Sequence, residues 1–140
     1  MFNLSSKVEY GILGCLALSL HTSPIPLSVR SIAEKETLSV RFLEQAMNRL
    51  KEKGLVESVR GPHGGYRLTR APKEMTLSDV INAMEGEKKR DSISSKPDIL
   101  NEIVSGITTV LEDHLNGIDF ECLARRVEIL REEGALMFHI

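Results

Sequence analysis

The chain has 140 residues, 41% hydrophobic and 4% aromatic, which suits one domain with a modest core and excludes an aromatic-rich barrel. Its two cysteines, Cys15 and Cys122, lie far apart. This excludes a disulfide framework and favours a reduced, cytoplasmic protein. Residues 1 to 75 hold 11 Lys+Arg against 7 Asp+Glu, whereas residues 76 to 140 hold 7 against 13. A basic first half and an acidic second half are typical of a polyanion-binding module on an acidic support.

The first predicted element is a helix over residues 5 to 20 that is apolar nearly all round and therefore buried on more than one face. Its run YGILGCLALSL also has the length of a signal-peptide core. However, no basic cluster precedes it, and it is too short to cross a membrane. We therefore interpret it as a buried helix, followed by a loop at TSPIP, where two prolines stop both helix and sheet.

Two short helices follow, separated by Glu36, Thr37 and Leu38, with Ser28 and Ser39 placed to cap them. The second helix ends at Gly54 and carries an apolar stripe formed by Leu43, Ala46, Met47 and Leu50. LVESVR (55 to 60) and YRLT (66 to 69) read as two antiparallel strands. A helix-turn-helix followed by a β-hairpin indicates a winged helix.

In the second half, Thr76 and Asp79 have capping-box spacing and predict a helix through Met84 that Gly86 closes. A polar segment follows, and then a long amphipathic helix over residues 97 to 115. A last helix is predicted from residue 119 to residue 132. The predicted fold is mainly α with a small β-hairpin wing. Its parts are a winged helix-turn-helix domain (1–86), a polar loop (87–96), and a dimerisation helix with a C-terminal helix (97–140).

The hairpin tip GPHGG is longer than a hairpin needs, since about two turn residues suffice. Its glycines permit positive φ and close backbone approach to a partner, and cationic side chains flank it. An ordinary mobile turn is the alternative. The composition favours DNA, because a narrow minor groove is strongly negative and attracts an inserted Arg or His. The candidate wing residues are Arg60, Gly61, Pro62, His63, Gly64, Gly65, Tyr66 and Arg67.

The second short helix is the candidate reader of the major groove. Gln pairs with adenine, Arg with guanine, and Glu accepts from cytosine. A solvated helix face has the same composition, but the place between a helix-turn and a wing favours reading. Val40 lies off the apolar stripe, and so do the candidate reading residues Arg41, Glu44, Gln45, Asn48 and Arg49.

The long helix offers either a cofactor-binding face or a homodimer seam. A seam is favoured because nothing else in a small winged helix covers its apolar row. The row consists of Leu100, Ile103, Val104, Ile107, Val110 and Leu111.

Chemistry at the cysteines is the weaker interpretation. Cys15 fits a core position, and Cys122 is either inert or activated by Arg125 and Arg126. The sequence has no nucleophile–base pair, phosphate-binding loop or paired acids, so we expect no enzyme and no metal site.

Three stretches together resemble the Rrf2 family of bacterial transcriptional regulators, over about residues 2 to 132. They are LSSKVEYGILGCLAL, LSVRFLEQAMNRLKEKGLVESVRGPHGGYRL and MTLSDVINAMEG. The resemblance implies a homodimer with a winged helix in each subunit, a long crossed dimerisation helix, and palindromic promoter DNA as the target. We then expect phosphate contacts from Ser5, Lys7, Tyr10 and Ser39.

Family members that sense through an iron–sulfur cluster or sense nitric oxide carry three cysteines in the loop before the dimerisation helix. Here that loop, GEKKRDSISSKP, has none. The chain is more similar to the cluster-free branch, typified by the cysteine-metabolism regulator, which takes its signal from a partner protein. We therefore expect a cytoplasmic, homodimeric DNA-binding repressor without a cofactor. The alternatives are a winged-helix module that binds a protein and not DNA, or a regulator of the same family that senses an iron–sulfur cluster or a small molecule.

Overall fold

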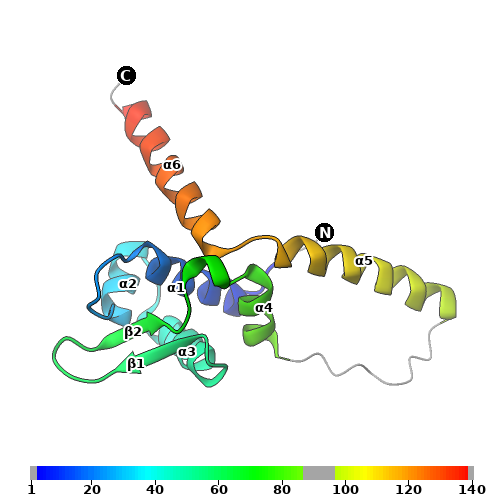
Figure 1. Cartoon of the computed structure of the whole chain (residues 1–140), viewed down its shortest axis with the longest axis horizontal. Helices are drawn as coiled ribbons and strands as arrows, with labels where there is room; N and C mark the ends of the chain where they lie inside the picture. The colour runs from blue at the N-terminus through cyan, green and yellow to red at the C-terminus, as the bar shows by residue number, and fades with distance from the viewer. Residues whose placement is uncertain (1–2, 87–96, 139–140) are drawn as a thin grey trace.

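Helices and one hairpin follow each other in the predicted order in the computed structural model, which describes residues 3 to 86 and 97 to 138. They are α1 (Ser6–Leu20), α2 (Val29–Glu36), α3 (Val40–Glu52), β1 (Val56–Val59), β2 (Gly65–Leu68), the 3-10 turn η1 (Pro72–Glu74), α4 (Leu77–Glu85), α5 (Asp98–Asn116) and α6 (Phe120–Phe138). In Figure 1, α1 to α4 and the hairpin form one group, which α5 and α6 leave in different directions. The predicted fold class is confirmed. The loop predicted at 87–96 lies outside the described residues.

Side-chain caps determine where most of the helices begin. Ser5, Ser28 and Ser39 each accept a hydrogen bond from the backbone N–H three residues later. At the start of α4 the capping box is complete, because Thr76 and Asp79 each accept the other's backbone N–H. The predicted caps at Ser28, Ser39 and Thr76 are confirmed, since each depends on neighbours in the sequence alone, whereas the cap at Ser5 was not predicted.

The core forms around α1, which packs against α3, α4 and α6. Two glycines allow the close approach of the neighbouring helices. A Cβ on Gly11 would lie 2.5 Å from Cγ of Met84, and one on Gly14 would lie 2.7 Å from Sδ of Met47. A helix packed on several sides must be apolar nearly all round, as its sequence indicates. The apolar stripe of α3 is buried here as predicted.

The hairpin is joined to the chain before α2 by a short bridge. Leu27 and Tyr66 exchange both backbone hydrogen bonds, with N···O distances of 3.0 and 2.8 Å. Within the hairpin, Val56 pairs with Leu68 and Val59 with Gly65. The bridge was not predicted from the sequence, and it fixes the tip-proximal end of β2 against the segment just before α2.

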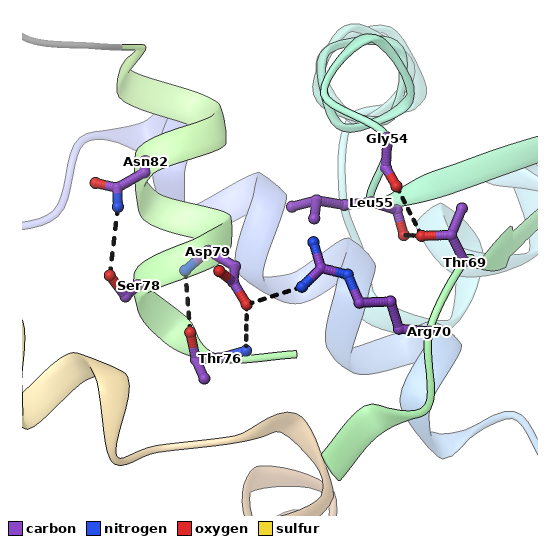
Figure 2. Close-up of polar contacts among 8 residues, drawn as sticks. All are labelled: Gly54, Leu55, Thr69, Arg70, Thr76, Ser78, Asp79 and Asn82. Atoms are coloured by element: carbon purple, nitrogen blue, oxygen red, sulfur yellow. Dashed lines mark hydrogen bonds and ion pairs between the residues drawn. The ribbon is translucent and has the colours of Figure 1, made fainter. Parts of the chain in front are cut away.

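Figure 2 shows how the end of β2 is held to the rest of the domain. The Thr69 hydroxyl donates to the carbonyl of Gly54 at 2.7 Å. Arg70 lies 3.4 Å from a carboxylate oxygen of Asp79, which also accepts the N–H of Thr76. The chain leaving the wing is therefore tied both to the end of α3 and to the start of α4.

The two last helices differ in how well the sequence predicts them. α5 follows Pro97 as predicted. The predicted end of the last helix at Glu132 is wrong, because α6 continues to Phe138. Gly134 lowers helix propensity but does not end the helix, and the good helix formers Ala, Leu and Met follow it. Phe120 is fully buried and anchors the start of α6.

Candidate nucleic-acid interface

The outward side of α3 carries four polar side chains on one exposed face. Arg41, Glu44, Gln45 and Asn48 are all exposed, while the stripe on the opposite side is buried. Their spacing of three or four residues places them as neighbours on the helix surface. Arg41 has no ion-pair partner within residues 3–86 and 97–138. This face, which we call the reading face, presents donors and acceptors suited to base edges.

Arg49 does not belong to the reading face. Its Nε donates to the carbonyl of Ala83 at 3.0 Å, and another guanidinium nitrogen lies 3.6 Å from a carboxylate oxygen of Glu52. The side chain therefore fastens α3 to α4. Its position off the apolar stripe suggested a reader, but a residue at the edge of a stripe also faces the neighbouring helix. We leave Arg49 out of the residues proposed to read bases.

A tight turn forms the tip of the wing. The N–H of Gly64 donates to the carbonyl of Gly61 at 2.9 Å, which puts Pro62 and His63 at the corners of the turn. Both corner residues are exposed. Arg60, next to the turn, is also exposed and has no ion-pair partner in the described part of the chain. The tip thus presents one unpaired cation beside an imidazole.

The three glycines of the tip are required for different reasons. Gly61 has a φ of 120°, a conformation that side chains with a Cβ rarely adopt. Gly64 and Gly65 have ordinary φ values, but a Cβ on either would lie 2.4 Å from a carbonyl oxygen, of Val59 and of Leu27 respectively. The sequence predicted that these glycines allow close approach of a partner. At Gly64 and Gly65 the close neighbour is instead the protein's own backbone.

Tyr66 connects the wing to the reading face. Its hydroxyl donates to Oδ1 of Asn48 at 3.2 Å. Burial, and after it the charge of Glu44, raises the pKa of the Tyr66 hydroxyl. Beside it, Arg67 forms an ion pair with Glu57 across the hairpin. Sequence reasoning identified Tyr66 and Asn48 separately and missed the bond that joins them.

The start of α1 lies beside the start of α3. The Tyr10 hydroxyl accepts the N–H of Ser39 at 3.2 Å, and Ser39 in turn caps α3. The Tyr10 ring meets the ring of Phe42 edge-on, with centroids 6.1 Å apart. Lys7 is exposed nearby, in the first turn of α1. The four residues expected to contact phosphate (Ser5, Lys7, Tyr10 and Ser39) therefore lie at two helix starts, and Phe42, 55% exposed, was not singled out by the sequence.

The apolar row of α5 is open to solvent in the single chain. Ile103, Ile107 and Val110 are 50%, 63% and 70% exposed, and Leu100 and Val104 are exposed as well. Leu111 is half-buried. Gly106 lies within this row, and a Cβ there would meet nothing within 4 Å.

The two cysteines lie in different surroundings. Cys15 is fully buried in α1, and burial raises the pKa of its thiol to about 12, which disfavours the thiolate that a metal requires. Cys122 is exposed at the start of α6. The described residues contain no group of three or more His, Cys, Asp or Glu side chains able to hold a metal ion. None of the described helices is long and apolar enough to cross a membrane.

Comparisons with known proteins agree with this geometry. The model of the Rrf2 family, described as iron-dependent transcriptional regulators, matches residues 4 to 126. The transcriptional regulator IscR of Aliivibrio salmonicida is 40% identical over 82 residues, which are 59% of this chain but only 49% of that protein. IscR of Pectobacterium atrosepticum is 31% identical over 134 residues, covering 91% of this chain and 82% of the relative. The match to the first relative thus spans about half of that protein's length.

Solved structures extend the likeness to the whole fold. CymR, the global cysteine regulator of B. subtilis, superposes with a TM-score of 0.78 at 31% identity, covering 90% of this chain and 98% of CymR. IscR of T. potens superposes with a TM-score of 0.77 at 31% identity, covering 90% and 88%. The resemblance found in the sequence is confirmed. The chain belongs to the Rrf2 family, whose members are transcriptional regulators and not enzymes.

Proposed function

We propose that the protein is a transcriptional repressor that binds palindromic operator DNA as a homodimer. The observation that carries this proposal is the bond between Tyr66 and Asn48, which joins the reading face to the wing. A helix of this kind fits the major groove, and a cationic hairpin beside it reaches the adjacent backbone or minor groove. Membership of the Rrf2 family and the likeness to CymR and IscR support the same function.

Different side chains contact different parts of the DNA in this proposal. Arg41, Glu44 and Gln45 face base edges, where hydrogen bonds distinguish one base pair from another. Arg60 and His63 enter or border the minor groove. The start of α1, with the ammonium of Lys7, contacts a phosphate.

A second copy of the chain is the proposed partner of the apolar row on α5. An exposed row of this size is unusual for a soluble monomer. Two copies related by a two-fold axis cover each other's rows, and Gly106 within the row lets the two helices approach closely. The same symmetry places two reading faces about one duplex turn, ~34 Å, or a multiple of it apart.

Selection of bound fragments from genomic DNA with the purified full chain tests the proposal. We expect recovered fragments to share an inverted repeat whose half-sites are separated by whole turns of the duplex. Recovery of no enriched sequence, together with no retardation of any duplex at low salt, would contradict DNA binding and favour a protein-interaction module.

Replacing Arg60 with Ala should weaken binding to every duplex and flatten its salt dependence. Each phosphate contact contributes a slope of about 0.9 in log affinity against log salt. One contact per subunit therefore predicts a loss of about two units of slope per dimer. The measurement is a fluorescence-anisotropy titration at several salt concentrations. Lys73→Ala, which removes an exposed cation from η1, is the matched control and should keep the slope. An unchanged slope for Arg60→Ala would remove this residue from the DNA backbone.

Protein purified without oxygen should contain no stoichiometric iron and no visible absorption. The loop before α5 has no cysteine, and Cys15 is a buried thiol with a raised pKa. Two cysteines fall short of the usual four cluster ligands unless His or carboxylate groups join. Metal analysis and an absorption spectrum of freshly purified protein make the measurement. A brown protein with iron would contradict the expectation and point to Cys122 together with residues of α1.

A further inference from the structure

A hollow of about 400 Å³ lies between the start of α1, the outer side of α3 and the end of α4. Small-molecule sites usually have volumes of about 300–1,000 Å³ and mostly apolar walls with a few polar groups. The residues that matter for its chemistry are Ser6, Lys7, Tyr10, Phe42, Gln45 and Met84. The contacts proposed for DNA use the rim of this hollow and leave its interior unexplained.

The inner walls of the hollow suit an aromatic ring. Met84 borders the hollow but is fully buried, so its flexible, polarizable side chain would have to shift to contact an occupant. Tyr10 and Phe42 meet edge-on at 6.1 Å, and Phe42 is more than half exposed, which leaves part of its ring open to a further ring.

The rim of the hollow suits an anion. The Lys7 ammonium and the Ser6 hydroxyl lie in the first turn of α1, where the helix dipole adds positive potential. Lys7 has no ion-pair partner among the residues that the structure describes. An occupant with one negative group at the rim and an aromatic body against Phe42 would satisfy both parts of the hollow.

We propose that a small aromatic anion, such as an aryl carboxylate or sulfonate, binds in this hollow and excludes DNA. The exclusion of DNA rests on the proposed DNA-binding function, whereas binding of the anion does not. Two features connect occupation of the hollow to DNA. Lys7 and Gln45 line the hollow and are also expected to contact DNA. Tyr10, whose hydroxyl accepts the N–H of the capping residue Ser39, transmits a shift of its ring to the start of α3.

A pair of dyes with the same body and different charge tests the binding site on the full chain without DNA. Anilinonaphthalene sulfonate carries the anion, and N-phenylnaphthylamine lacks it. Phe42→Ala should weaken both dyes by about two- to tenfold, since an aromatic pair contributes ~0.5–1.5 kcal/mol beyond its area. Lys7→Met should weaken only the sulfonate, by about two- to fivefold, as expected for one exposed ion pair.

Val40→Ala is the matched control, because Val40 is an exposed apolar residue of α3 that does not line the hollow. It should bind both dyes like the wild type, and circular dichroism should show the same helix content in all variants. If Phe42→Ala and the wild type bind the dyes equally, the dyes bind at another surface and the proposal is overturned. A loss of both dyes on Lys7→Met would overturn the assignment of the anion to the rim.

A random-sequence duplex at low salt tests the exclusion of DNA. Saturating duplex should release the bound sulfonate dye, and by reciprocity the dye should weaken duplex binding by the same factor. If the duplex binds and the dye keeps its affinity, exclusion is overturned. If no duplex binds at all, the proposed DNA function fails, while the dye titrations still decide whether the hollow is a ligand site.

Discussion

Ile107→Asp should convert the proposed dimer into a folded monomer that has lost specific DNA binding. Ile107 is 63% exposed in the single chain, so a carboxylate there remains in water and the subunit keeps its fold. In the proposed dimer the same position is covered. Each subunit then loses about 1.5–3 kcal/mol of apolar burial and buries an unpaired charge at a further cost of several kcal/mol. Two symmetric positions weaken the dimer at least about a thousandfold, since 1.4 kcal/mol is a factor of ten.

Sedimentation at low micromolar concentration, with circular dichroism and an operator titration, measures the effect. Thr109→Asp is the matched control, because it adds the same charge to another face of α5 away from the apolar row. The control should stay dimeric and bind the operator. If the Ile107 variant remains dimeric and binds DNA normally, the subunits meet at another surface. If it unfolds, α5 stabilises the single chain in a way that its exposure does not indicate.

The sequence predicts most of the fold because its signals are local. Caps such as Ser28, Ser39 and the Thr76 box fix helix starts through neighbours within three residues. The apolar stripe of α3 determines which face of that helix is buried. The predicted end of the last helix was wrong, because no local signal distinguishes a glycine that ends a helix from one, like Gly134, that lies within it.

The candidate site can be predicted only partly from the sequence, because its hydrogen bonds join segments that are far apart in the chain. Nothing local indicates that Tyr66 donates to Asn48 or that Arg49 bonds to the carbonyl of Ala83. Both pairs depend on how the helices pack. The structure therefore reduces the number of side chains proposed to contact DNA. The contacts of the remaining side chains with DNA stay predictions that mutation must test.

Glu44→Ala should change which half-sites the protein prefers more than it changes overall affinity. A carboxylate accepts from the amino group of cytosine, and one such contact distinguishes base pairs by ~1–3 kcal/mol. The same carboxylate repels the phosphates, so its removal should leave non-specific binding equal or stronger. Glu44 lies on the exposed reading face. Burial, and after it the charge of Glu44, raises the pKa of Tyr66.

Binding of the wild type and the variant to a library of half-sites with one randomised position at a time measures this change. We expect the preference to relax at one base pair in each half-site and to persist at the others. Glu34→Ala is the matched control, since it removes an equal charge from the exposed side of α2 and should leave all preferences intact. A uniform loss of affinity across every sequence would show that Glu44 supports the structure of α3 or the wing. Relaxation at a single base pair, with stronger binding to random duplex, requires a carboxylate that faces a base, because no loss of structure strengthens binding while erasing one preference.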